Sequence, residues 1–484
     1  MEIAATSGSA QADITAFAVF DPIGAVPDVD PRLAALVESG EVRGTAGATC
    51  VIHQDDGRRL VAAGAGARDQ LDADAIRDAA AAVARLGLGG TLAWLLDDSL
   101  GLSAAEQARA ATEGIVLGGY DQGQWKTAEP KPKKIDRLVL VSGDEATLQL
   151  AQRAERVAQW ANRARDLVNR PPNDLTPERL ADRAAEIAEG SSVLSCESMD
   201  FDQITALGMG AFAAVAQGSH NPPRLIVLRY EPPGARDDLV LGLVGKAITF
   251  DTGGISIKQA PYMEDMKGDM AGGAAVIEGT GAIAELELPV RVLAVVAATE
   301  NMVGGGAYRP GDILTAMNGK TIEVINTDCE GRLVLADALW YARQQGATHM
   351  LDLATLTGAM ELALGDLYAG VFGNDAGWRD EVVAAGEASG DHAWPFPLHR
   401  RYRRYVDSNF ADMKNGSALR QGSPALASEF LREFTGEGPW AHVDMAGPGF
   451  LTRSRGDYLT QQGGTGWGVR LIAELAQRLS EPLR

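Results

Sequence analysis

The last two-thirds of the chain alternates near-continuous apolar runs with stretches of helical character. Three of these runs have the length and composition of buried strands: LIVLRY at 225–230, LVLGLVG at 239–245 and VRVLAVVAA at 290–298. Helical stretches such as 272–286 and 333–345 precede or follow them. Apolar strands joined by helical crossovers predict a mostly parallel sheet covered by helices on both faces. In such sheets ligands bind at the carboxyl ends of the strands.

The first part of the chain alternates shorter apolar runs with Ala-rich patterns of helical spacing. Strands are predicted at 45–52, 60–63, 90–96 and 138–142, and helices at 73–86 and 103–117. Strands that alternate with helices indicate an α/β fold. We therefore expect a separate N-terminal α/β domain.

A long polar stretch between these two parts has the composition of a single helix. Pro171 and Pro172 follow it, and neither can continue a helix. Thr176 and Pro177 then suit the N-cap and the first position of a new helix. The predicted organisation is an N-terminal domain at 1–145, a linker helix at 146–168 and a C-terminal domain at 169–484.

Composition and charge narrow the class of protein. Of the 484 residues, 46% are hydrophobic, and the net charge is -21, which disfavours binding to nucleic acid or to anionic membranes. The three cysteines lack CxxC spacing, which is typical of a reducing compartment. No apolar run reaches the roughly 20 residues of a membrane helix. The N-terminus shows no basic region before an apolar core, so we expect no signal peptide and a cytoplasmic location.

Acidic side chains gather in two short segments. These are VGKAITFDTGGISIKQAPYMEDMKGDMA at 244–271 and NTDCEGRL at 326–333. The i, i+2 spacing places Asp328 and Glu330 on one side of an extended segment. Asp251 follows an apolar strand, and Asp269 stands near the start of a helix. Four converging acids repel one another unless cations lie between them, and hard divalent ions prefer carboxylates. We predict a two-metal site; the alternative is that each acid is a helix cap or a surface charge.

Three basic residues, Lys246, Lys258 and Arg332, stand among these acids. Basic side chains beside metal-binding acids indicate a site that is prearranged to stabilise the negative charge of an oxyanion as it develops. A lysine can also ligate a metal as the neutral amine, because a dication lowers its pKa. The histidines have no HExxH spacing and no GxSxG motif occurs, so thermolysin-like zinc enzymes and serine hydrolases are disfavoured.

These segments resemble the signature stretches of the leucyl aminopeptidases, the cytosolic two-metal exopeptidases. The similar segments are VGKAITFDTGGISIK, MKGDMAGGAA and, most specifically, NTDCEGRL, with further stretches at 164–177, 300–313, 353–359 and 464–472. The resemblance covers about residues 160–484, whereas the N-terminal third matches only in its α/β style. It implies a macro-like N-terminal α/β domain and a C-terminal metallopeptidase domain with a mostly parallel or mixed sheet covered by helices.

The resemblance also implies two divalent metal ions per subunit, manganese or zinc, with magnesium or cobalt as further possibilities. The tighter ion would be held by Lys246, Asp251, Asp269 and Glu330. The more exchangeable ion would be held by Asp251, Asp328 and Glu330. A hydroxide that bridges the two ions would attack the peptide carbonyl.

Catalytic and substrate-binding positions follow from the same resemblance. Lys258 would stabilise the gem-diolate, and Arg332 would hold a bicarbonate ion that serves as general base. The apolar pocket for the substrate side chain would be lined by Met266, Thr355, Gly358 and Ala446. Met266 is equally compatible with plain core packing. The implied activity is release of leucine and other apolar N-terminal residues from short peptides with a free N-terminus, by a homohexamer.

A few positions depart from the family pattern, and two other functions stay open. Ala247, Gln259 and Cys329 stand where Gly, Pro and Ala are usual, and Gly449 stands where relatives have a larger apolar residue. Cys329 is either a thiol sensitive to oxidation or a small buried residue. A dipeptidase for cysteinyl-glycine would share every site residue. A DNA-binding regulator is the other alternative, and the net charge weighs against it.

Overall fold

The computed structural model describes residues 1–8, 10–24, 26–127, 131–418 and 421–480, and these form two compact units. The first unit holds Met1–Asn162 together with Arg453–Gln461, and the second holds Arg163–Thr452 and Gln462–Arg484. A segment from late in the chain therefore completes the first unit. Within the described ranges, no helix has the length and apolar character needed to cross a membrane.

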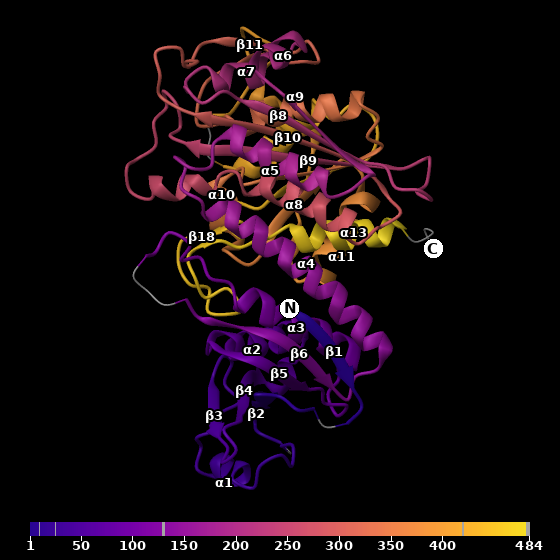
Figure 1. The fold of residues 1–484 in the computed structure, drawn as a ribbon. Coiled ribbons are helices and arrows are strands. Elements are labelled where there is room, and N and C mark those ends of the chain that lie inside the picture. The colour runs from indigo at the N-terminus through magenta and orange to yellow at the C-terminus, as the bar shows by residue number, and fades with distance from the viewer. Residues whose placement is uncertain (9, 25, 128–130, 419–420, 481–484) are drawn as a thin grey trace. The chain divides into compact units, whose positions relative to one another are not determined.

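The first unit is built on a six-stranded sheet (Figure 1). Its elements are β1 (Glu2–Thr6), β2 (Ile14–Asp21), α1 (Leu33–Glu38), β3 (Thr49–His53), β4 (Arg59–Ala67), the 3-10 helix η1 (Arg68–Gln70), α2 (Ala73–Arg85), β5 (Leu88–Leu95), α3 (Ala104–Gly118), β6 (Lys133–Val141) and the start of α4 (Glu145–Asn169). The strand order is β1-β6-β5-β2-β4-β3, and only β3 runs antiparallel to its neighbour. The carboxyl ends of β2, β5 and β6 therefore lie side by side.

Local sequence explains where the helices of this unit begin. Asp72 caps α2 by accepting a hydrogen bond from the backbone N–H of Ala75. Ser103 and Glu106 form a reciprocal capping box at the start of α3. The two helices pack against each other over the sheet, and an Ala-rich face on α2 allows them to approach closely.

The second unit is built on an eight-stranded mixed sheet. Its elements are the end of α4, α5 (Pro177–Glu189), β7 (Leu194–Met199), α6 (Phe201–Ala206), α7 (Gly210–Ala216), β8 (Arg224–Tyr230), β9 (Val240–Asp251), the 3-10 helix η2 (Met263–Gly268), α8 (Ala271–Glu285), β10 (Arg291–Asn301), β11 (Ile313–Thr315), β12 (Thr321–Glu323), α9 (Gly331–Gln344), β13 (His349–Ala354), α10 (Gly358–Leu364), β14 (Ala369–Gly373), α11 (Ala376–Ser389), β15 (Ala393–Pro395), the 3-10 helix η3 (Arg400–Val406), β16 (Met413–Lys414), α12 (Ser423–Arg432), β17 (Trp440–Asp444), β18 (Phe450–Leu451), β19 (Gly463–Gly464) and α13 (Val469–Ser480).

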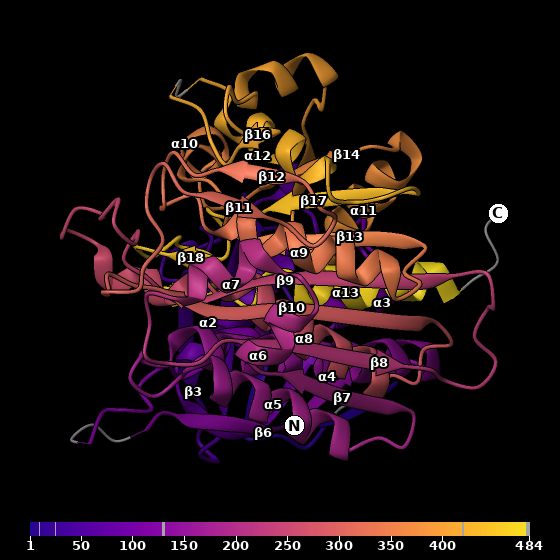
Figure 2. The same cartoon turned by 90° about the horizontal axis from the view of Figure 1, so that it is seen from above.

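The strand order in this sheet is β15-β14-β17-β13-β9-β10-β8-β7 (Figure 2). The four central strands, from β17 to β10, are mutually parallel, and antiparallel pairs flank them. The α/β architecture with a mixed sheet covered by helices is thus confirmed. The three apolar runs predicted as strands are β8, β9 and β10. Thr176 and Pro177 do start a helix, α5, with the Thr176 hydroxyl accepting from Arg179 N.

Helices cover both faces of the central strands. One face packs against α7 and α9 in a large apolar core, and the other face packs against α8. The approach of α8 depends on glycine, because a Cβ added to Gly272 would lie 2.1 Å from the carbonyl oxygen of Leu353 on β13. Lys246 lies on the face that packs against α9, where its side chain contacts Gly331 at the start of that helix.

The sequence patterns missed β1 and β2 and started β3 too early. β1 is a short, half-buried strand whose partner, β6, comes far later in the chain. Its pairing is therefore a long-range event that a local pattern does not signal. In the predicted 45–52 strand, only Thr49 onward pairs with β4, and the residues before it form turns.

Candidate metal centre

The predicted metal-binding acids come from three separate elements that end at one edge of the second sheet. Asp251 is the last residue of β9, and Asp269 is the C-cap of η2. Asp328 lies in the loop before α9, and Glu330 is the N-cap of that helix. Since β9 is a central parallel strand, its carboxyl end is where this fold places ligands.

Three of the acids are close enough to share a cation. Asp251, Asp328 and Glu330 each offer one carboxylate oxygen, and these oxygens lie within 4.8 Å of one another. Asp251 and Glu330 are both 2% exposed, whereas the Asp328 side chain is half-buried. The structure thus brings together the acids that the sequence placed in two different motifs.

Lys246 joins the fourth acid to this group. Its Nζ lies 2.8 Å from Asp269 Oδ1 and 2.8 Å from Glu330 Oε1, and the side chain is almost fully buried. Burial alone would lower the pKa of Lys246, but Asp269 and Glu330 outweigh burial and raise it. Gly331 leaves room for this side chain, since a Cβ there would lie 2.6 Å from Lys246 Cε.

Lys258 bridges the other side of the cluster. Its Nζ lies 2.8 Å from Asp251 Oδ2 and also forms an ion pair with Asp328. Burial opposes the charge on Lys258, but the acids around it, Asp251 first, raise its pKa. Burial and the neighbouring Asp251 raise the pKa of Asp328 to about 7.

The pKa values of the remaining acids are set by the same two opposing effects, burial and the neighbouring charges. Burial raises the pKa of Asp251, and Glu330 adds to the rise. Burial raises the pKa of Asp269 well above its usual range, although Lys246 opposes this. Glu330 differs, because Lys246 and Lys258 outweigh burial and lower its pKa. Two ammonium groups therefore offset only part of the charge of four clustered carboxylates.

The donor set fits divalent cations. Asp269 Oδ2 and Glu330 Oε2 are buried and have no hydrogen-bond partner in the described part of the chain. Buried carboxylate oxygens without partners are costly unless a cation satisfies them. Hard ions such as Mg²⁺ and Mn²⁺ take oxygen ligands of this kind, and Zn²⁺ accepts oxygen together with nitrogen.

Hydrogen bonds from neighbouring residues orient these carboxylates. Asn301 Nδ2 and the backbone N–H of Gly253 each donate to Asp251 Oδ1 at 2.8 Å. The Thr355 hydroxyl donates to Asp269 Oδ1 at 2.8 Å. Such contacts fix a carboxylate in the geometry that a metal requires. The local sequence pattern does not single out Asn301, although it ends β10 as Asp251 ends β9, and the two residues are paired in the sheet.

Arg332 lies in the first turn of α9, two residues after Glu330, and is 5% exposed. Its Nη1 donates to the carbonyl oxygen of Asn415 at 2.9 Å, while its Nε has no hydrogen-bond partner within the described ranges. Together with Lys258, Asp328 and Cys329 it lines an open cavity of about 1140 Å³. A guanidinium with a free donor on a cavity wall is suited to hold a small anion.

Of the four residues predicted for the substrate pocket, Met266 and Thr355 contact Asp269, whereas Gly358 and Ala446 lie in segments that contact Asp444. Met266 is half-buried in η2, and its carbonyl oxygen accepts from Asp269 N at 3.3 Å. Gly358 starts α10, directly after Thr357, whose hydroxyl donates to Asp444. The N–H of Ala446 also donates to Asp444, at 3.3 Å. Asp444 therefore ties together the loops that carry Gly358 and Ala446; that these residues contact substrate stays a prediction.

A carboxylate cluster with lysines at the ends of parallel strands is the kind of site at which metal-dependent hydrolases hold their divalent ions. Family comparisons narrow the class. The catalytic domain of the cytosol aminopeptidase family matches residues 162–473, and its N-terminal domain matches residues 25–129. The chain belongs to the cytosol aminopeptidase family and is a metal-dependent aminopeptidase.

Individual relatives agree with this assignment over nearly the whole chain. A probable cytosol aminopeptidase of Solibacter usitatus is 47% identical over 92% of this chain and 93% of its own. One of Roseiflexus castenholzii is 43% identical over 91% of each chain. Among solved structures, the bottromycin maturation enzyme BotP in complex with Mn has 35% identity and a TM-score of 0.87, over 97% of this chain and 100% of its own.

Proposed function

We propose that this aminopeptidase releases leucine and other apolar residues from the N-termini of short peptides, at a centre that holds two divalent cations. The observation that supports this most strongly is the convergence of four carboxylates and two lysines, with two buried acceptor oxygens left without partners. Mn²⁺ and Zn²⁺ are the ions we favour, and Mg²⁺ and Co²⁺ fit the same ligands.

The residues around the cluster divide into two overlapping ligand sets. One cation would be held by Lys246, Asp251, Asp269 and Glu330. The other would be held by Asp251, Asp328 and Glu330. When bound, the pair would supply a bridging hydroxide as nucleophile and polarise the scissile carbonyl. A dication beside Lys246 reverses the local field that now raises the pKa of this amine, and so favours its neutral, ligating form.

The remaining polar groups act on the substrate. Lys258 places a positive charge beside Asp251 and Asp328, where it stabilises negative charge that develops on the scissile carbonyl oxygen. Arg332 would hold bicarbonate on the wall of the cavity, and that anion would accept the proton that a water loses when it becomes the attacking hydroxide. Asp269 lies where a carboxylate would attract the free α-amine, which restricts cleavage to the first residue of a peptide.

The preference for apolar side chains rests on the four residues predicted for the substrate pocket. Met266, Thr355, Gly358 and Ala446 would form the wall that contacts the first side chain of the peptide. A cytoplasmic location and a homohexamer belong to the same proposal. BotP is described as a bottromycin maturation enzyme, so the substrate panel has to extend beyond leucyl substrates. It also includes cysteinyl-glycine, because a dipeptidase for that substrate would share every site residue.

Hydrolysis of leucine p-nitroanilide by chelator-stripped protein tests the proposal. The rate should vanish on stripping and return with Mn²⁺ or Zn²⁺, and bicarbonate should raise it. A folded protein that binds metal and cleaves other aminoacyl substrates but not leucine would contradict the leucine preference. Ranking kcat/KM across leucyl, methionyl, glutamyl and cysteinyl-glycine substrates then identifies the preferred side chain.

A further inference from the structure

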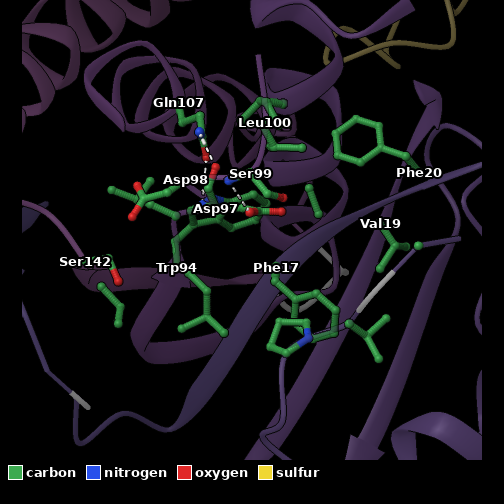
Figure 3. Close-up of a pocket in the computed structure, with 18 of the residues that line it drawn as sticks. Phe17, Val19, Phe20, Trp94, Asp97, Asp98, Ser99, Leu100, Gln107 and Ser142 are labelled. Carbon is green, nitrogen blue, oxygen red and sulfur yellow. Dashed lines mark hydrogen bonds between the residues drawn. The ribbon is translucent and has the colours of Figure 1, made fainter. Parts of the chain in front are cut away.

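A second cavity, of about 440 Å³, lies wholly within the first unit (Figure 3). It opens where the neighbouring strands β2, β5 and β6 end, so it occupies the edge at which a parallel α/β sheet binds ligands. Its volume is within the range of about 300–1,000 Å³ that small-molecule sites have. None of the residues proposed for the metal centre lines it.

The inner wall of this cavity is apolar and largely aromatic. Phe17 and Phe20 come from β2, and Trp94 comes from β5; all three are at most 4% exposed. Ile23 and Leu100 extend the apolar wall from the loops that follow these strands. The wall therefore suits a hydrocarbon or aromatic group, whose transfer out of water favours binding.

A cation stands at one side of the cavity. Arg68 is the first residue of η1 and is exposed, and no described carboxylate forms an ion pair with it. Its Nη1 lies over Gly24, where an added Cβ would come within 3.2 Å of it. An unpaired guanidinium is a bidentate donor for a carboxylate.

Two carboxylates, Asp97 and Asp98, line the same cavity from the loop between β5 and α3. A buried glutamine holds this loop in place: Gln107 Nε2 donates to the carbonyl oxygens of Asp97 and Leu102 at 2.9 Å, and Gln107 Oε1 accepts from Asp97 N at 3.0 Å. Asp97 Oδ1 also accepts from the N–H of Ser99 at 2.8 Å. The acids are thus presented by a braced loop, which is visible in Figure 3.

The backbone beside the cavity carries strain. Ser142, directly after β6, has φ of 69°, in the left-handed region that disfavours a residue with a Cβ. Residues held in this region concentrate at functional sites. The strain, the braced acidic loop and the unpaired arginine all border the same apolar space.

The combination of charges selects the ligand. Two carboxylates repel nucleotides and other polyanions, and the guanidinium repels a simple amine. A molecule with one carboxylate, one ammonium group and an apolar body satisfies both. We propose that this cavity binds a free α-amino acid with an apolar or aromatic side chain, its carboxylate on Arg68, its ammonium group at Asp97 and Asp98, and its side chain against Phe17, Phe20 and Trp94. Amino acids are also what an aminopeptidase releases.

Calorimetric titration of the metal-loaded, full-length protein with L-phenylalanine tests the proposal. Arg68→Gln and Asp98→Asn should each weaken this binding at least tenfold. Arg43→Gln is the matched control, because Arg43 is exposed in the same unit, outside the cavity, and the substitution removes the same charge. Asp251→Asn disrupts the metal centre, so any binding of phenylalanine that this variant loses belongs to that centre. The binding assigned to the cavity should remain in Asp251→Asn, with an affinity within twofold of the native protein.

Ligand analogues test the two charges separately. 3-Phenylpropionate lacks the ammonium group and phenethylamine lacks the carboxylate, and each should bind at least tenfold more weakly than phenylalanine. Circular dichroism and melting temperature establish that the exposed substitutions leave the fold intact. The proposal is overturned if Arg68→Gln binds phenylalanine as well as the native protein does, if 3-phenylpropionate binds equally well, or if AMP binds and phenylalanine does not.

Discussion

At the scale of single residues, the metal centre is a problem of charge compensation. Lys246 touches Asp269 and Glu330, and Lys258 touches Asp251 and Asp328, so each ammonium group serves two acids. Burial makes each uncompensated carboxylate costly, and this cost is visible in the raised pKa values of Asp251 and Asp269. Further positive charge is therefore needed to balance the four carboxylates, and bound divalent cations would supply it.

The role of Lys258 is tested by removing its charge. Lys258→Met should lower kcat by about 10²–10³-fold, the range seen when one group that stabilises a transition-state charge is lost. KM should change much less, because the charge acts on the developing oxyanion. Lys134→Met is the control, since Lys134 is exposed on β6 in the first unit. Steady-state kinetics on fully metal-loaded samples measure kcat and KM of both variants. An unchanged kcat in Lys258→Met would show that Lys258 does not stabilise the transition state.

At the scale of elements, the site depends on how closely α8 and α9 pack on the central strands. Gly272 brings α8 against β13, and Gly331 lets the first turn of α9 pass over Lys246. Both contacts position backbone that leads directly into metal-binding residues, since Asp269 precedes α8 and Glu330 caps α9.

Gly272→Ala should destabilise the protein by about 3 kcal/mol, because the new methyl group would overlap a backbone carbonyl that side-chain rotation cannot move. Urea unfolding followed by circular dichroism measures the change. Gly305→Ala is the matched substitution, since a Cβ at Gly305 meets nothing within 4 Å. Equal stability of the two variants would show that α8 does not need this close approach.

The stability of the folded protein should depend on pH through the contact between α2 and the segment Arg453–Gln461. Asp78 on α2 accepts a hydrogen bond from Tyr458 N at 2.8 Å, and burial together with Asp457 raises the pKa of Asp78 from 3.8 to about 6. The folded state therefore keeps a proton that the unfolded state loses between about pH 4 and pH 6. The stability that this proton gives, at most about 3 kcal/mol, is present below pH 4 and is lost as the pH rises through 6.

Asp78→Asn mimics the protonated carboxyl and keeps an acceptor for Tyr458. Its melting temperature relative to the native protein should rise as the pH increases from 4 to 8, with Asp69→Asn as an exposed control. A difference between Asp78→Asn and the native protein that stays constant across this range would contradict the raised pKa.

At the scale of the whole molecule, the local patterns of the sequence predict more of the second unit than of the first. The strands β8, β9 and β10 can be predicted from the sequence, because both faces of each are buried and their residues form nearly continuous apolar runs. The NTDCEGRL segment likewise predicts that Asp328 and Glu330 lie where the chain turns into a helix, and the structure has Asp328 in a turn and Glu330 as the N-cap of α9. The predicted extended conformation of this segment is wrong, because Glu330 already has helical dihedral angles. In the first unit β1 is short and completed by a distant partner, so its local pattern is weak.

Other features lie beyond local patterns altogether. That Arg453–Gln461 belongs with the first unit follows from contacts such as Tyr458 with Asp78, which are far apart in sequence. The roles of Asn301 and Asp444 depend on sheet register and loop packing rather than on composition. Charged motifs reveal which residues carry chemistry, whereas the groups that orient them emerge only from the fold.

The most direct test of the two-cation centre is the number of metal ions bound per chain. Protein dialysed to equilibrium against buffer that contains Mn²⁺ should hold two ions per chain above the buffer concentration, by elemental analysis. Asp269→Asn should lose the ion it helps to hold and retain about one, while Glu330→Gln, which removes a shared ligand, should retain fewer. A native protein that holds only one ion at saturation, or the same two ions in all three forms, would contradict the account.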